Sequence, residues 1–266
     1  MAEKETKNNP KNLIEPVPEQ VEKLEASIPA EMKLSFKDQI RADREKRAVE
    51  AAKAALEAWV PKTQLGRDVK EKKIKTLDEV LNYGKKVLEE QIIDLLVTLD
   101  SDLLLIGQAK GKFGGGKRRA WRQTQKKTME GNVVTFASMA IVGDRKGHVG
   151  VGYGKSKETL PARAKALRLA KLSLIKVTRG FESPEAPGSV PHTVPFAVEG
   201  KCGSVRIKLL PAPRGTGLVI GDEGKKILKL AGIQDVYAVT KGQTRTTFNL
   251  AKAVIDALSK TNRMKQ

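Results

Sequence analysis

The sequence has few of the residues that catalytic sites and disulfide-bonded folds most often use. Cys202 is the single cysteine among 266 residues, which excludes an intramolecular disulfide and fits a reducing compartment. With His148 and His192 as its two histidines, the chain has too few ligands for a zinc site of the usual kind. The same scarcity argues against Cys–His or Ser–His catalysis. We therefore expect no enzyme, no metal and no cofactor.

Long apolar segments are also missing, and aromatic residues make up only 4% of the chain. No apolar run approaches the ~20 residues of a membrane-spanning helix, and the polar residues 1–10 do not predict a secretory signal. Basic residues, by contrast, are abundant: 50 Lys and Arg against 31 Asp and Glu give a formal net charge of +19. Such an excess predicts a polyanionic partner, with nucleic acid as the first candidate and anionic membrane as the second.

The clearest pattern lies in residues 132–177. A β-branched apolar run at 133–142 predicts a strand, and the polar residues 143–148 predict a turn. The following segment alternates large residues with glycine: Val149, Gly150, Val151, Gly152, Tyr153 and Gly154. Because neighbouring strand residues face opposite sides, one face of this strand is bare, which predicts that another backbone packs closely against it.

A helix is predicted next, with Thr159 as its N-cap and Pro161 in its first turn. Helical spacing predicts that four apolar residues pack on the sheet: Leu160, Ala164, Leu167 and Leu174. Three basic residues gather on another side: Lys157, Lys165 and Arg168. A small sheet that carries such a helix suits a partner with phosphate groups.

The glycines before Lys155 and Ser156 invite a comparison with nucleotide-binding loops. A P-loop requires a glycine at the position that Val149 occupies, and the dinucleotide-binding pattern requires its third glycine where Lys155 stands. Close packing inside a sheet is the better interpretation of these glycines.

The residues before this stretch predict a tail, an extension and a loop. Residues 1–34 mix Lys, Glu, Asn and Pro and are expected to form a flexible tail. A helical extension is expected at 35–85, with a capping box at Ser35 and Trp59 as a core anchor. Helical spacing resumes between Leu88 and Leu99. The Gly- and Lys-rich residues 107–119 predict a mobile basic loop that orders on a polyanion.

The fold class that these patterns predict is α+β. Residues 86–180 are expected to form a helix, three strands (the first at 120–128) and a helix, the order of double-stranded-RNA-binding modules. Residues 181–192 are expected to be a linker. Residues 193–266 are expected to form a second α+β domain. Strands are expected at 193–198 and 204–210, joined by a turn around residues 200–203, and at 236–239, and helices at 225–231 and 244–258.

Several motifs resemble one known family, the fifth protein of the small ribosomal subunit in its archaeal and eukaryotic form, with the archaeal form favoured. The similarity covers about residues 59–260. It rests on Gly143-Asp144 with Gly147-His148-Val149-Gly150, on Lys157-Glu158 with Pro161, on 209–217 with its Gly-Thr-Gly, on Leu230-Ala231-Gly232-Ile233 with Asp235, and on 59–67 with Lys73-Ile74-Lys75.

The resemblance implies a structural ribosomal protein located in cytoplasmic ribosomes. Its implied partners are small-subunit ribosomal RNA, the fourth and eighth proteins of that subunit, and mRNA near the entry channel. Its implied roles are assembly, mRNA entry and decoding accuracy. A free RNA-binding module or RNA chaperone is the alternative, although such a module would not need the second domain. An RNA-modifying enzyme lacks a credible set of catalytic residues.

Two groups of site residues are predicted. The RNA-binding group is basic throughout: Lys117, Arg118, Arg119, Arg122, Lys126, Lys127, Lys146, His148, Lys155, Lys157, Lys165, Arg168, Lys201 and Arg206. The second group is expected to contact a protein neighbour and to influence decoding: Arg214, Gly215, Thr216, Gly217, Lys225 and Lys226. Prolines stiffen the turn around Arg214, and glycines permit unusual backbone dihedral angles there. Lys225 and Lys226 are expected to open a helix, where an external anion would offset the repulsion of the dipole, unless both are simply solvated.

Overall fold

The computed structural model describes residues 56–84, 86–107, 118–182 and 190–262, and the single positions 43, 47, 50 and 54. Residues 1–58 and 59–266 form two compact units, and every element discussed below belongs to the second. The predicted tail, most of the predicted helix that starts at Ser35 and the loop residues 108–117 lie outside the described residues. None of the helices within these ranges is long and apolar enough to cross a membrane.

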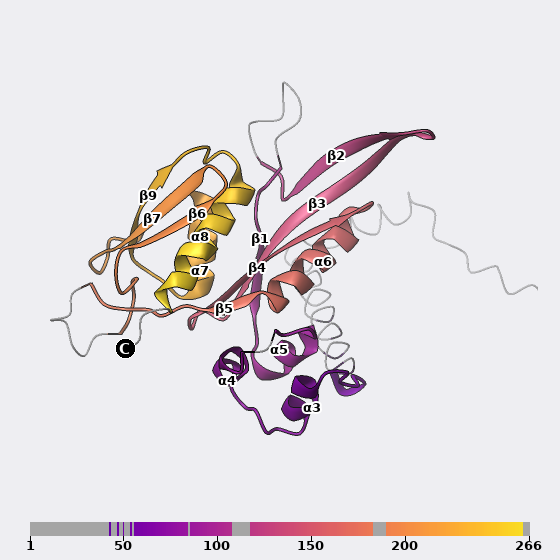
Figure 1. Cartoon of the computed structure of the whole chain (residues 1–266), viewed down its shortest axis with the longest axis horizontal. Helices are drawn as coiled ribbons and strands as arrows, with labels where there is room; N and C mark the ends of the chain where they lie inside the picture. The colour runs from indigo at the N-terminus through magenta and orange to yellow at the C-terminus, as the bar shows by residue number, and fades with distance from the viewer. Residues whose placement is uncertain are drawn as a thin grey trace, which may run out of the picture. The chain divides into compact units, whose positions relative to one another are not determined.

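The first sheet is antiparallel and has five strands rather than the three predicted (Figure 1). Its strands are β1 (Asp100–Leu103), β2 (Trp121–Thr128), β3 (Gly131–Gly143), β4 (His148–Ser156) and β5 (Leu174–Lys176). The predictions for β2, β3 and β4 are confirmed. β1 was missed because it is short and polar, Asp-Ser-Asp-Leu, and exists only by pairing with the end of β3.

Helix α6 (Thr159–Leu172) packs on the glycine face of β4, as the bare face predicted. A Cβ atom added to Gly150, Gly152 or Gly154 would overlap the backbone of α6. The residues that face the glycines are alanines, Ala162, Ala166 and Ala170, all fully buried.

The predicted apolar stripe of this helix is therefore wrong except at Leu167, which packs against the cluster that holds Ala140 and Val142 of β3. Leu160 is 72% exposed, Ala164 is also exposed, and Leu174 belongs to β5 rather than to the helix. The leucine spacing gave a wrong prediction because the backbone of α6 lies so close to β4 that only methyl side chains fit between them. The predicted N-cap Thr159 is the first helical residue, and the cap position is Glu158.

The second sheet has four strands in the order β6-β7-β9-β8: β6 (Val198–Cys202), β7 (Val205–Pro211), β8 (Leu218–Val219) and β9 (Val236–Lys241). The predicted strand 193–198 is wrong, because β6 begins where that prediction ended. Gly200 is not part of the turn. It lies inside β6, where an added Cβ would overlap Ala253 of α8 (Thr247–Thr261), and the chain turns at Gly203 with a φ of 60°.

Helix α7 (Asp222–Ala231) begins three residues earlier than predicted and ends at Gly232 in the left-handed conformation, as predicted. Its first turn holds Asp222 and Glu223, which suit the positive end of the helix dipole. Lys225 and Lys226 therefore do not open the helix, and the argument for an external anion beside them is wrong. The ammonium group of Lys226 donates to the Leu103 carbonyl at 2.9 Å.

Contacts between the two sheets' domains form one continuous core. Ile141 and Val149 of the first sheet share a buried cluster with Ile207 and Leu228 of the second domain. The backbone N–H of Arg145 donates to the Leu230 carbonyl at 2.9 Å.

A second cluster lies under three short helices, α3 (Gln64–Lys70), α4 (Leu77–Asn82) and α5 (Glu90–Leu96). Val80 and Ile92 are fully buried in it, and Trp59 packs against it as predicted. The helical spacing over Leu88–Leu99 overestimates α5, because the backbone is already extended at Val97.

Candidate nucleic-acid interface

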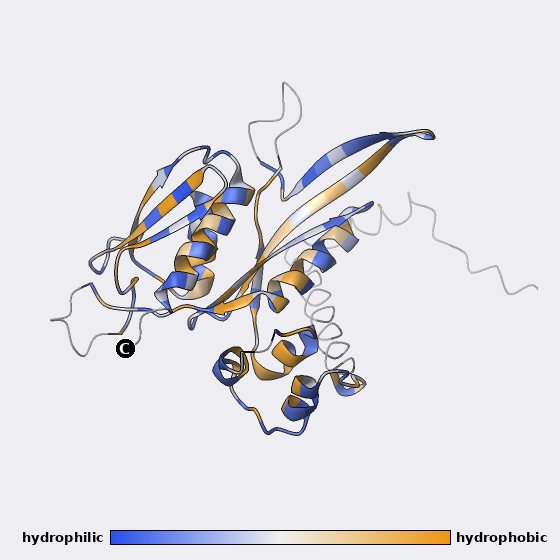
Figure 2. Ribbon diagram, in the orientation of Figure 1, coloured by the Kyte–Doolittle hydropathy of each residue, from blue (hydrophilic) through white to orange (hydrophobic). Residues whose placement is uncertain are grey.

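The β2–β3 hairpin carries cations on both of its faces. Residues paired in register point to the same side of a sheet, so Arg122 of β2, Ala137 of β3 and Lys155 of β4 share one face. We call this face, which also carries Lys126, the open face, because α6 packs on the opposite one. Lys127 alternates to the α6 side. Figure 2 shows β2 as hydrophilic along most of its length beside the more hydrophobic β3.

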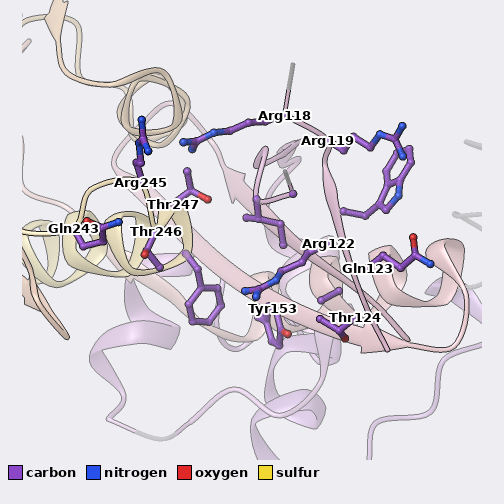
Figure 3. A pocket seen from close by; sticks show the side chains of 15 residues that line it. Arg118, Arg119, Arg122, Gln123, Thr124, Tyr153, Gln243, Arg245, Thr246 and Thr247 are labelled. Carbon is purple, nitrogen blue, oxygen red and sulfur yellow. The ribbon is translucent and has the colours of Figure 1, made fainter. Parts of the chain in front are cut away.

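A groove of about 1000 Å³ lies over part of the open face (Figure 3). Its floor is formed by β2, β3 and β4, and its sides by the chain around Arg118 and by the start of α8. The lining residues are Ile106, Gly107, Arg118, Arg119, Trp121, Arg122, Gln123, Thr124, Ala137, Tyr153, Gln243, Arg245, Thr246, Thr247 and Phe248.

Charge in the groove has one sign. Four arginines line it, and the described lining residues include neither an acidic residue nor a lysine. Arg118 and Arg245 approach from opposite sides, and Arg122 extends over the floor (Figure 3). Arg119 instead turns to Trp121, with its guanidinium carbon 6.0 Å from the ring centroid. Among the described residues, no ion pair neutralises any of these four groups.

Aromatic and helix-end groups complete the groove. Tyr153 is 39% exposed, and its ring meets Phe248 edge to face at a centroid distance of 5.0 Å. At the start of α8, Thr246 makes no side-chain capping bond and the first turn holds no acidic residue. The positive end of that helix dipole therefore adds to the potential that the arginines create. The groove can attract an anion and also offer it a ring to stack on.

Comparisons with known proteins agree along most of the chain. The family model for the N-terminal domain of ribosomal protein S5 matches residues 120–178, and the one for its C-terminal domain matches residues 200–266. The small ribosomal subunit protein uS5 of Nanoarchaeum equitans is 48% identical over 206 residues, which cover 77% of this chain and 88% of the relative. The chain belongs to the ribosomal protein S5 family.

Two further relatives with the same name, uS5, support an archaeal type. The protein of Methanococcus maripaludis strain C7 is 45% identical over 219 residues, covering 82% of this chain and 89% of the relative. That of Aeropyrum pernix is 44% identical over 215 residues, covering 80% and 92%. The S5 resemblance and the α+β class predicted from the sequence are thereby confirmed.

His148 is largely buried and hydrogen-bonded, unlike a solvated turn residue. Its Nδ1 is 2.6 Å from Asp144 Oδ2, its Nε2 is 3.0 Å from Asp78 Oδ1, and its side chain is 13% exposed. These hydrogen bonds, the one to Asp144 first, raise the pKa of His148 above its ordinary 6.5, although burial opposes them. Hydrogen bonding to His148 in turn lowers the pKa of Asp78. Because both ring nitrogens are engaged, His148 joins α4 to the sheet and has no ring nitrogen left for RNA.

The other predicted RNA-binding residues are spread over several surfaces. Lys157, Lys165 and Arg168 are exposed at the entry and on the outside of α6, and Lys146 is exposed in the β3–β4 turn. Lys201 and Arg206 pair across β6 and β7 and are exposed on the second sheet. Lys117 lies outside the described residues. The structure thus brings together only Arg118, Arg119 and Arg122 in the groove, with Lys126 and Lys155 on the face beside it.

Sequence reasoning missed the groove's second wall. Gln243, Arg245, Thr246 and Phe248 come from the start of α8, which was read only as the beginning of a helix. One signal was present: residues 240–249 contain two cations and no acid, although acids are favoured at a helix start. That these residues face β2 depends on packing between the domains and could not be read from the spacing.

Proposed function

We propose that this S5-family protein is a structural constituent of the small ribosomal subunit that binds ribosomal RNA and catalyses no reaction. Its place is in cytoplasmic ribosomes, where it takes part in translation. The observation that carries RNA binding is the open face with its arginine groove. A free RNA-binding module or chaperone is not favoured, because the similarity to the uS5 relatives extends through both S5 domains.

The N-terminal domain, in this proposal, meets RNA in the manner of double-stranded-RNA-binding modules. Such modules contact phosphates and 2′-hydroxyl groups across the grooves of the duplex, and they do not depend on the base sequence. Exposed lysines on the β2–β3 hairpin and at the entry of α6, such as Lys126 and Lys157, support this mode. The domain division 1–34, 35–85, 86–180, 181–192 and 193–266 belongs to the same proposal.

The turn before β8 is proposed to contact a protein neighbour, the fourth protein of the subunit, and thereby to influence decoding. Arg214 is held there by a bond from its guanidinium group to the Val190 carbonyl at 3.1 Å. Gly217 donates its N–H to Asp235 at 2.7 Å, and Gly215 has a φ of 85° and open space where a Cβ atom would stand. A fixed but uncovered turn suits a rigid partner. Contacts with the eighth protein and with mRNA near the entry channel are proposed alongside it.

Sedimentation of a cell lysate tests the ribosomal assignment. We expect nearly all of the tagged full-length protein in the small-subunit peak of a sucrose gradient, and in heavier ribosome fractions. A predominant signal at the top of the gradient would contradict the assignment and favour the free module. A lysate treated with ribonuclease is the control, because digestion should release the protein from the peak.

A further inference from the structure

We propose that the arginine groove binds an unstacked, single-stranded stretch of RNA, and so recognises a different form of RNA from the hairpin and α6 lysines. This inference rests on the proposed RNA-binding function and names the ligand of one part of the interface. Its support comes from the groove's size, the type of its cations and its exposed rings.

Size favours a few nucleotides over a duplex. The groove's volume, about 1000 Å³, is at the upper end of the roughly 300–1000 Å³ typical of small-molecule sites. A few nucleotides fit such a space. A duplex is a wide cylinder, and double-stranded-RNA readers contact it over many base pairs with exposed surfaces rather than inside a concavity.

The cations in the groove are all arginines, although lysine outnumbers arginine more than twofold in the chain. Arginine has a planar guanidinium group that binds a phosphate through two parallel hydrogen bonds and can also stack on a base. Lysine offers a compact, strongly hydrated point charge without a planar group that can stack on a base. Arg118, Arg122 and Arg245 therefore suit a strand whose phosphates and bases are both accessible, and Lys126 and Lys127 suit the outside of a helix.

The exposed rings provide the second half of such a site. Proteins that bind single strands combine a positively charged groove with aromatic side chains on which bases stack. Each stacked base contributes about 1–3 kcal/mol to the binding free energy. Tyr153 lies on the groove floor, and Phe248 supports it from the side. Lys252 lies 4.4 Å from the Phe248 ring centroid, so that ring is already occupied. The open ring is that of Tyr153, beside the guanidinium group of Arg122 (Figure 3).

Polar groups around these rings match the chemistry of RNA. Three threonines, Thr124, Thr246 and Thr247, and Gln243 line the groove, and the Thr124 hydroxyl is already paired with that of Thr135 at 2.8 Å. Such groups both donate and accept hydrogen bonds, as base edges and 2′-hydroxyls do. The backbone of an acidic peptide could pair with these groups as well, and its carboxylates with the arginines, but it would leave the aromatic ring without a base to stack on.

Fluorescence anisotropy with the full-length protein tests the proposal. The probes are fluorescein-labelled single-stranded hexauridylate and a labelled RNA duplex, each titrated at one fixed salt concentration. Arg122→Ala and Arg245→Gln should each weaken binding of hexauridylate about 10-fold, and duplex binding about 2-fold or less. Tyr153→Leu should also weaken hexauridylate binding about 10-fold, because it removes stacking and leaves the charge unchanged.

Lys127→Ala is the matched control, because it removes a cation from the other face of the same hairpin. It should weaken duplex binding more than hexauridylate binding. Arg245 is exposed at the start of α8, so its variant keeps the test valid if a strand variant fails a thermal melt.

Three results would overturn the assignment. The groove variants could leave hexauridylate binding unchanged, or they could weaken both RNAs equally. Alternatively, a decaglutamate peptide could displace hexauridylate at equal concentration, which would identify a peptide site. Failure of the groove assignment leaves the small-subunit peak of the wild-type protein intact, whereas failure of the proposed function abolishes that peak regardless of hexauridylate binding.

Discussion

The two faces of the first sheet are built from the same strands but differ in what covers them. On the closed face, glycines of β4 meet alanines of α6 without space for another atom. On the open face, cationic and aromatic side chains surround a groove. Alternation along a strand allows this separation, because each residue serves only one side. The chain can thus pack α6 on one face, pack the second domain on part of the other, and leave the rest of that other face accessible in the groove.

The largest difference in stability between changes on the two faces should come from a side chain added to the closed face. Gly152→Val places a branched side chain against the Ala166 carbonyl and the Ala170 amide, so α6 must move away. We expect a loss of about 3 kcal/mol in the free energy of unfolding, measured by urea denaturation. Lys155→Val in the same strand, on the open face, is the control and should change it by about 0.5 kcal/mol or less. Equal losses would contradict the distinction.

A smaller loss of stability is expected where the second domain contacts the first sheet. Glu223 of α7 is 7% exposed and accepts the N–H of Leu105 at 3.0 Å, which fixes the second domain beside β1. Glu223→Ala leaves that N–H without its acceptor, so we expect a loss of about 1–3 kcal/mol. Asp222→Ala, one residue away at a side chain that is 91% exposed, is the comparison and should cost less. Thermal melts of both variants measure the difference.

The closed face should also show a pH dependence through His148, which alternates to the same side as the glycines. Its raised folded pKa means that protonated His148 stabilises the fold. That contribution is complete below the ordinary pKa of 6.5 and is lost as the pH rises through the folded pKa. The loss is about 1.4 kcal/mol for each unit by which the pKa is raised.

Urea denaturation from about pH 6 to pH 9 should therefore show the wild-type stability declining relative to that of His148→Gln, which does not titrate. The pKa values of its partners Asp78 and Asp144 are lowered, so neither carboxylate titrates in this window. Parallel profiles for the two proteins would show that His148 does not make this contribution.

The smallest effects should come from single lysines outside the groove. Lys155→Ala and Lys157→Ala each remove one phosphate contact, so each should reduce the salt dependence of RNA binding by about one unit of slope. Affinity should fall to a similar extent for different RNA sequences. Filter binding at several salt concentrations measures the slope, and Glu158→Gln, directly after Lys157, should not reduce it.

Local patterns predicted the parts of the fold that local chemistry determines. Glycines alternating along β4 indicated a bare face, and the polar residues 143–148 indicated the hairpin turn. The α6 stripe was correct only at Leu167, because the shape of β4 and not the hydrophobicity of the leucines selects the buried residues Ala162, Ala166 and Ala170. The strand at 193–198 was misplaced because a glycine at a close approach, Gly200, was read as a turn.

The candidate site was only half predictable for a related reason. Arg118, Arg119 and Arg122 are close in sequence, and their charge alone suggested RNA binding. Arg245 and Phe248 reach the same groove from more than a hundred residues later in the chain, through contacts between the two domains. The spacing of residues in the sequence does not predict this proximity, because the proximity depends on how the two folded domains pack against each other.

The contact between β4 and α6 also has a consequence for the order of folding. Its two sides are neighbours in the sequence, so little loop entropy is lost when they meet, and such local contacts form early. Chains fold from the N-terminus during synthesis. We therefore expect β3, β4 and α6 to associate while the second domain is still being made. The apolar side of β4 would then be exposed until Ile207 and Leu228 are synthesised and pack on it. We expect a nascent chain that stalls at this point to be especially prone to aggregation.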